Sequence, residues 1–582
     1  MMSFDRLSSI DCLLCSCLLL LFWGGCALPK VGVTAPIVGR SVEISFPAAT
    51  HQAPVTGRML LMFSRTNDPE VRLQVGWFNS PPIFGMDVSG LHAGQVSVFD
   101  ASVPGYPLAS LKELPPGDYF VQALLNVYTQ FRRVDGHVIW AHMDQWEGQN
   151  FNLSPGNLFS MPQKVHLSAR GHERLKIQLT QIIPAIQVPA DTVWVKHIKI
   201  QSDLLTRFWG RPMYLGAVVL LPRDYDSHPE ALYPVIYQQG HFSHDAPFQF
   251  RTTPVSETEA VRQARESHGV ETGYEFYKSW SSDDFPRAIA VTFLHPTPYY
   301  DDSYAVDSAN NGPYGSAIMT ELIPYLEKQF RIVSEPYARM LIGGSTGGWE
   351  ALALQLFHPS FFGGAWALYP DPIDFRRYQL INIYRDKNSF VLGPAYLPVP
   401  SSQSWAHVER SYSRAVDGQS VATVRQISQV EAVLGSRDRS GGQLAIWDAA
   451  FGPVGDDGYP KPLWDRQTGQ IDHSVALYMR DHGYDLRYYA EANWPEIAQQ
   501  LAGKLNLYCG DMDNYYLNLG VYLFAQFLDS HKIDTESDSI GYGRPLKGHG
   551  WQPTSNASLV KIMMERVVRN APKDVSKVWV DE

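Results

Sequence analysis

The stretch ARMLIGGSTGGWEALALQL, residues 338–356, is the most informative part of the chain for its fold. Its start, Ala338–Ile342, is a short apolar run typical of a buried strand, and its end, Trp349–Leu356, consists of good helix formers. Glycines occupy the turn between them, where the chain can bend sharply because no Cβ atoms stand in the way. The stretch therefore predicts a strand that turns directly into a helix.

The same alternation of strand and helix continues on both sides of this stretch. Further strands are predicted at the apolar runs 217–222, 234–237 and 288–293. Residues 318–330 predict an amphipathic helix, because Leu322, Leu326 and Phe330 fall on one face. Strands that alternate with helices indicate an α/β fold with a mostly parallel sheet covered on both faces.

The chain before this region has a different pattern of apolar residues. From about residue 30 to 190, short alternating runs such as Val42–Phe46 and Val71–Val75 are separated by Pro and Gly. This pattern predicts a β-rich, sandwich-like accessory domain ahead of an α/β domain at 195–582. Three roles are open for the accessory domain: glycan binding, shaping of a substrate cleft, and packing against the second domain.

Residues 1–27 have the layout of an export signal. Arg6 precedes a short apolar run at 12–23, and small residues follow that run. These small residues suit cleavage by an ordinary signal peptidase, whereas Gly25-Cys26 resembles a bacterial lipobox that would leave Cys26 with a lipid anchor. We therefore expect an exported protein that is periplasmic, secreted or lipid-anchored to the cell envelope.

Composition excludes several classes of function. The 582 residues carry a formal net charge of -11 and no Lys- or Arg-rich stripe, so nucleic acid is not an expected partner. Four of the five cysteines fall within the export signal, which leaves Cys509 alone and excludes a thiolate zinc site in the rest of the chain. Asp301, Asp302 and Asp307 lie near His295, but their spacing fits a turn better than a metal site. We expect no metal and no cofactor.

Ser345 is the predicted nucleophile. It lies in the turn described above, in GGSTG at 343–347, which matches the pattern G-x-S-x-G. Between a strand and a helix, this pattern lifts the serine hydroxyl above the edge of the sheet. The helix that follows offers its first backbone N–H groups, notably that of Thr346, to an oxyanion.

A serine nucleophile needs a base and an acid that orients the base, and in this setting they follow in the order Ser, acid, His. His549 is the predicted base, because it lies in a glycine-lined loop, GHGW at 548–551, that lets an imidazole reach back to the serine. The acid is expected after the apolar run 505–509. We favour Asp513 and keep Asp511 as the alternative; the one that is not the acid is expected to cap the next helix.

A second donor for the oxyanion is expected after an early strand of the sheet. Residues 234–237 form such a strand, and Gly240 after it allows the backbone to approach a substrate closely. The backbone N–H of His241 or Phe242 would then face the oxyanion.

Three segments together resemble the putative esterase family, the esterase D-like branch of the α/β-hydrolases. They are YPVIY at 233–237, NGPYG at 311–315 with ELIPYLE at 321–327, and GGSTGGW at 343–349. This branch includes feruloyl esterases, siderophore esterases and mycolyltransferases. The resemblance covers about 195–375 and 500–582, and it implies an α/β-hydrolase fold with a Ser-Asp-His triad and no metal cofactor.

The chain departs from this family in two places. QGH at 239–241 stands where the family has His-Gly, which leaves the detail of the oxyanion loop open. The separation of Ser345 and Asp513 is also longer than a compact member needs. Residues from about 375 to 500 are therefore expected to be an insertion, which is either a lid-like region over the site or plain scaffold.

These observations predict a serine hydrolase that cleaves carboxylic esters through an acyl-enzyme. Its substrate would be a small-molecule or glycan-linked ester. An acyltransferase of the same fold is an alternative, since an alcohol instead of water can accept the acyl group. A catalytically idle surface protein that binds glycans through residues 30–190 is the alternative from another class.

Overall fold

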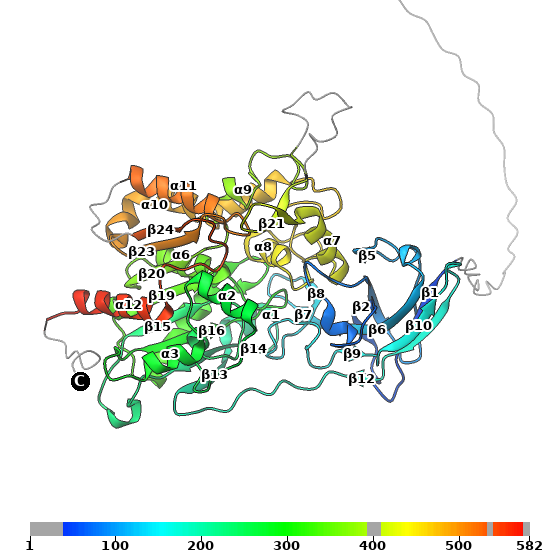
Figure 1. Cartoon of the computed structure of the whole chain (residues 1–582), viewed down its shortest axis with the longest axis horizontal. Coiled ribbons are helices and arrows are strands. Elements are labelled where there is room, and N and C mark those ends of the chain that lie inside the picture. Colours follow the sequence, from blue (N-terminus) through cyan, green and yellow to red (C-terminus); the bar gives the residue numbers. More distant parts are fainter. Residues whose placement is uncertain (1–38, 393–408, 532–538, 574–582) are drawn as a thin grey trace, which may run out of the picture. The chain divides into compact units, whose positions relative to one another are not determined.

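The computed structural model describes residues 39–392, 409–531 and 539–573 (Figure 1). The predicted export signal at 1–27, with its lipobox-like Cys26, lies outside the described residues. Within the described ranges, no helix is long and apolar enough to cross a membrane.

An eight-stranded sheet forms the centre of the α/β region. In spatial order its strands are β13 (Val195–Ser202), β14 (Met213–Leu220), β16 (Ile289–Leu294), β15 (Val235–Gln239), β19 (Arg339–Gly344), β20 (Gly364–Leu368), β23 (Leu505–Gly510) and β24 (Ser539–Gly543). Only β14 runs antiparallel to its neighbours in this sheet. The mostly parallel sheet expected from the sequence is therefore present.

Helices cover both faces of this sheet. Successive side chains of a central strand therefore lie in two different apolar cores. Ile289, Val291 and Phe293 of β16 join one apolar cluster, whereas Ala290 joins the other. The helices that contribute to the first cluster include α1 (Asp203–Trp209), α4 (Tyr314–Ala317), α5 (Ile323–Gln329), α6 (Thr346–Phe357), α10 (Leu486–Leu501) and α11 (Asn518–Ser530). Those of the second are α3 (Gly273–Trp280) and α12 (Asn556–Asn570). An apolar strand buried on both faces is what a covered parallel sheet requires.

The N-terminal part contains two sheets that share one apolar core. The smaller consists of β1 (Ser41–Ser45), β4 (Ser97–Phe99) and β11 (Arg174–Gln178); the larger is built around β2 (Val55–Ser64), β3 (Ile83–Leu91) and β6 (Gly117–Val127). Ile44 and Phe99 from the first sheet lie in the same cluster as Leu61 and Val121 from the second. Inward-facing apolar residues from both sheets thus make up this core.

The strand predicted at Val71–Val75 is wrong. Val71–Gln74 form a short 3₁₀ helix, η1, in which Val71 is buried and Leu73 is exposed. The backbone N–H of Arg72 donates to the side chain of Gln122 on β6, at 2.7 Å, and not to a neighbouring strand. The sequence alternates here, but the segment packs beside β2 and β6 as a 3₁₀ helix and pairs with neither strand.

The region between β20 and β23 packs against the N-terminal sheets. It holds β21 (Ser411–Arg414), β22 (Ser420–Thr423), α7 (Val424–Leu434), α8 (Gln443–Phe451), α9 (His473–Asp481) and α10. Val430 and Val433 of α7 share an apolar cluster with Leu60 of β2. The buried Arg58 of β2 donates to the carbonyl of Val433 at 2.7 and 3.0 Å, which caps the end of α7.

An ion pair between the buried Arg40 and the half-buried Glu173 lies at the end of the smaller sheet, and it yields a stability prediction. Arg40 lies 2.9 Å from Glu173, and Ser168 donates its backbone N–H to the same carboxylate at 2.6 Å. Burial alone would raise the pKa of Glu173, but hydrogen bonds from Ser168 and Arg40 lower it to about 2. We expect Glu173→Gln to reduce the free energy of unfolding of these sheets by about 1.5–3 kcal/mol, as for hydrogen bonds to a charged group.

The sign of the pH dependence follows from the lowered pKa. Since Glu173 titrates lower in the folded chain than its ordinary 4.5, its contribution is complete above that value and is lost as the pH falls towards 2. We therefore measure the free energy of unfolding in urea at pH 7 and at pH 3. The difference between Glu173→Gln and the unchanged chain should be smaller at pH 3 than at pH 7. Glu43→Gln, which breaks a pair with the exposed Lys176 on the neighbouring strand, is the control and should have little effect at either pH.

Candidate active site

Ser345 occupies a strained turn between β19 and α6. Its φ is 58° and its ψ is -123°, a conformation that residues with a Cβ rarely adopt. The turn is too tight for side chains on either side: a Cβ on Gly343 would lie 2.2 Å from the carbonyl oxygen of Gly347. A Cβ on Gly347 would lie 2.2 Å from the carbonyl oxygen of Gln239, at the end of β15. The glycines of the motif thus hold the start of α6 against the end of β15.

This close contact gives a prediction for Gly347→Ala. The added methyl group has to push α6 away from β15, which moves Ser345 and the backbone around it. We expect kcat for the ester hydrolysis predicted from the sequence to fall by about 10²-fold, the usual cost of a displacement near 1 Å at a reacting group. Gly520→Ala in α11 is the control, because a Cβ there has its nearest neighbours at 3.6 Å, an ordinary contact, and it should behave like the unchanged chain. Equal activity of both variants, with the fold intact by circular dichroism, would contradict the prediction.

His549 and Asp513 form a hydrogen-bonded pair. His549 Nδ1 lies 2.8 Å from Asp513 Oδ2, and Asp513 is fully buried. The other oxygen, Oδ1, accepts the backbone N–H groups of Tyr515 at 2.9 Å and Leu517 at 3.2 Å. The backbone N–H of His549 in turn donates to Asn514 Oδ1 at 2.7 Å. Both partners of the pair are therefore fixed by the loop that follows β23.

Asp511 has a different position. Its Oδ1 accepts the backbone N–H of Lys547 at 3.1 Å, two residues before His549. It does not cap α11, as the sequence had suggested for the carboxylate that is not the acid, because that helix has no side-chain cap. The N–H groups of Tyr515 and Leu517, just before α11, bind Asp513. Asp511 thus shapes the histidine loop, and Asp513 contacts the imidazole itself.

Ser345 and His549 open into one cavity of about 700 Å³. Three parts of the chain line it. The N-terminal part contributes residues including Trp77 and Phe78, and the region between β20 and β23 contributes residues including Tyr412 and Trp447. The remaining walls come from the loops at the ends of the central strands. The N-terminal part therefore lines this cavity, and its role stays a prediction.

The hydroxyl of Ser345 contacts a residue that the sequence did not point to. Ser345 Oγ donates to Asp371 Oδ1 at 3.3 Å. Asp371 follows β20 and is 5% exposed, and it also accepts hydrogen bonds from Tyr304 at 2.5 Å, Thr346 at 3.1 Å and Gln443 at 3.1 Å. Burial raises the pKa of Asp371, and the bond from Tyr304 opposes that rise. No local signal in the sequence marks the contact of Asp371 with Ser345.

His241 lies in the same cavity, after β15, whereas Phe242 faces away from it. Phe242 packs edge-on against Trp146 with ring centroids 5.4 Å apart, and it is absent from the described lining of the cavity. Thr346 is fully buried at the start of α6. The structure thus brings the segments of Thr346 and His241 together beside Ser345, and the role of their N–H groups stays a prediction.

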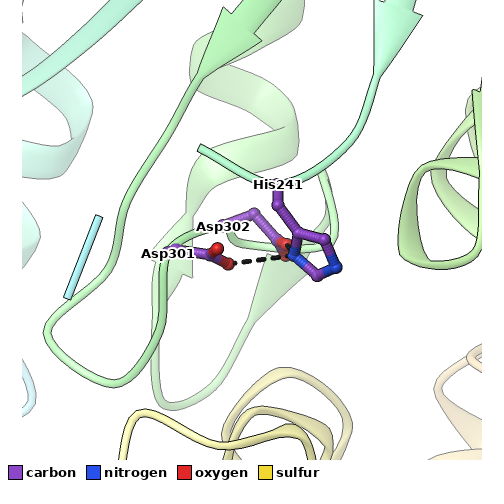
Figure 2. Close-up of side chains that lie close together, drawn as sticks. All are labelled: His241, Asp301 and Asp302. Atoms are coloured by element: carbon purple, nitrogen blue, oxygen red, sulfur yellow. Dashed lines mark hydrogen bonds and ion pairs between the residues drawn. The ribbon is translucent and has the colours of Figure 1, made fainter. Parts of the chain in front are cut away.

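The side chain of His241 makes a second contact with carboxylates in this cavity. Figure 2 shows its Nδ1 directed towards Asp301 and Asp302, at 3.2 Å from Asp301 Oδ1 and 3.3 Å from Asp302 Oδ2. Burial alone would lower the pKa of His241, but the two carboxylates raise it well above its ordinary value. These three residues, from two loops, are the described group in which a metal ion could be held.

Residues 213–429 match the model of the putative esterase family. This match confirms the resemblance drawn from the sequence over that part of the chain, which includes Ser345 and Asp371 but ends before Asp513. It also extends beyond residue 375 into the region that was expected to be an insertion. The match supports hydrolysis of esters as the class of reaction.

No curated protein sequence matches the chain. Among solved structures, a ferulic acid esterase is similar at 16% identity over 65% of this chain and 99% of its own, with a TM-score of 0.31. An S-formylglutathione hydrolase (FrmB) from Staphylococcus aureus is similar at 12% identity over 64% and 99%, with a TM-score of 0.28. An S-formylglutathione hydrolase from Agrobacterium tumefaciens is similar at 12% identity over 66% and 96%, with a TM-score of 0.28.

Proposed function

We propose that this protein is a serine hydrolase that cleaves carboxylic esters, with Ser345 as nucleophile, His549 as base and Asp513 as orienting acid. One observation carries this proposal. A serine in a strained strand-to-helix turn shares a cavity with a histidine whose Nδ1 is bound to a buried carboxylate. A histidine–carboxylate pair that shares a cavity with an elbow serine fits the needs of nucleophilic catalysis.

The reaction then follows from the geometry. Ser345 Oγ attacks the carbonyl carbon while His549 Nε2 takes the hydroxyl proton, and Asp513 holds the proton on Nδ1 so that Nε2 is free to accept. The N–H groups of Thr346 and of His241 or Phe242 stabilise the oxyanion. His549 returns the proton to the leaving alcohol, and water, activated by the same imidazole, releases the acid from Ser345. The Ser345 hydroxyl has to turn from Asp371 to His549 at the first step.

The residues that line the cavity indicate which kinds of ester it can bind. Their described lining has three carboxylates, Asp301, Asp371 and Glu431, and neither Lys nor Arg. Aromatic side chains cover much of the rest, including Trp77, Tyr300, Tyr412, Trp447 and Tyr515. Acidic and aromatic walls favour neutral or cationic esters with an aryl or sugar group and repel anionic ones.

Burst kinetics with p-nitrophenyl acetate test this proposal. An acyl-enzyme predicts a burst of p-nitrophenol of about one equivalent per active chain, followed by slower turnover. Added methanol separates the two fates of the acyl group: hydrolysis gives mainly acetate, and transfer gives mainly the methyl ester. A full chain that releases no p-nitrophenol above background, from this ester or from neutral aryl esters of longer acids, would refute the proposal.

A further inference from the structure

Three ligand atoms meet at one wall of the cavity. Nδ1 of His241, Oδ1 of Asp301 and Oδ2 of Asp302 lie within 4.8 Å of one another, and the two distances from the nitrogen are 3.2 and 3.3 Å. Ligand atoms about 2.0 Å from a tetrahedral zinc ion are about 3.3 Å apart. The spacing therefore suits a common metal ion as well as it suits hydrogen bonds.

The buried oxygen of this group has no hydrogen bond. Asp302 is 1% exposed, and its Oδ2, the atom that faces His241, has no hydrogen-bond partner among the described residues. Nδ1 carries at most one proton, and that proton can be donated well to only one of the two carboxylates. A divalent ion would bind both carboxylates and the neutral imidazole at once.

The lack of a Lys or Arg, among the described residues, beside the neighbouring buried carboxylates also favours a bound metal ion. Glu350 of α6 is fully buried, and neither of its carboxylate oxygens has a hydrogen bond among the described residues. Its ion-pair partner is His295, whose Nε2 lies 3.8 Å away and is likewise without a hydrogen bond. No ion pair of the described residues joins Asp301, Asp302 or Glu350 to a Lys or Arg. Buried carboxylates are normally paired with a cation or bound to a metal.

We propose that His241, Asp301 and Asp302 bind a divalent transition-metal ion, such as Zn²⁺ or Mn²⁺, at the wall of the cavity that contains Ser345. One imidazole nitrogen with two carboxylate oxygens favours such ions over Ca²⁺ and Mg²⁺, which prefer oxygen alone. His241 and Asp301 line the cavity, so the remaining coordination positions face it. A water molecule or an oxygen of the substrate would occupy them. This proposal replaces our expectation of a turn that binds no metal.

Co²⁺ is the probe, because its visible absorption reports the ligands directly. The full-length chain is treated with a chelator, dialysed and titrated with Co²⁺, and bound metal is then counted after exchange with Zn²⁺. We expect one equivalent per chain. His241→Ala and Asp302→Asn should each weaken binding by more than about 100-fold, because even outer-sphere changes cost 10–100-fold. His166→Ala removes an exposed histidine that pairs with Asp118 at 2.8 Å, and it should bind like the unchanged chain.

Metal binding can fail or succeed independently of ester hydrolysis, so this experiment tests the metal site separately from the proposed function. Ser345→Ala should bind Co²⁺ normally, since it leaves the three ligands in place, so metal binding is tested whether or not the protein hydrolyses esters. Less than a tenth of an equivalent bound by the unchanged chain would overturn the proposal, and that result does not depend on any variant folding. Stoichiometric binding that survives both His241→Ala and Asp302→Asn would overturn it as well.

Discussion

Ser345→Ala should lower kcat for ester hydrolysis by at least about 10⁴-fold, because it removes the atom that forms the acyl-enzyme. The strained backbone at Ser345 tolerates alanine as well as serine, so the fold should be preserved. The rate of p-nitrophenol release, measured beside the thermal unfolding temperature, checks both parts. Ser440→Ala is the matched control: Ser440 lines the same cavity, but its hydroxyl donates to Glu431.

Ser440→Ala should keep a kcat close to that of the unchanged chain. Similar losses in both serine variants would mean that the cavity is merely disturbed by either change, and a folded Ser345→Ala variant with undiminished turnover would exclude Ser345 as nucleophile.

Asp513→Asn should lower kcat by about 10⁴-fold, because an amide N–H facing Nδ1 stabilises the tautomer whose Nε2 carries the proton and cannot accept another. An asparagine Oδ1 can still accept the N–H groups of Tyr515 and Leu517, so the substitution acts at the 2.8 Å contact with the imidazole. Asp511→Asn is its control, since an asparagine Oδ1 can still accept the N–H of Lys547. It should change kcat by less than about 10-fold, as expected for a residue outside the proton-transfer chain.

The dependence of kcat on pH, measured for both aspartate variants, shows which of the two residues is the orienting acid. A larger loss in Asp511→Asn than in Asp513→Asn would reverse our assignment of the acid, which the sequence had left open between the two.

Much of the central fold could be predicted from the sequence, because the signals were local. The apolar runs before Ser345 and before Asp513 form β19 and β23, and the glycines at 343–347 form the sharp turn. The helix predicted from 318–330 consists of a π-helical turn (Ile318–Leu322) followed by α5, and α4 precedes it directly. Strong patterns in consecutive residues thus predict where strands and helices lie, but they do not predict irregular turns such as the π-helical one.

The contacts around Ser345 could not be predicted, because they join distant segments. Asp371 reaches the serine through the pairing of β19 with β20, and Gln443 and Trp447 arrive from α8. The choice between Asp511 and Asp513 depended on which way two side chains of one irregular turn point. The contribution of Trp77 to the cavity depended on how the N-terminal part packs, and nothing in its local sequence indicates that.

Fluorophosphonate labelling followed by peptide mapping tests the nucleophile most directly, because the probe reacts only with a serine activated by its surroundings. A catalytic Ser345 predicts one adduct per folded chain, on the peptide that contains Ser345, with loss of labelling after heat denaturation and in Asp513→Asn. Absence of an adduct from the folded chain, or an adduct on another residue, would contradict the assignment of Ser345 as the nucleophile.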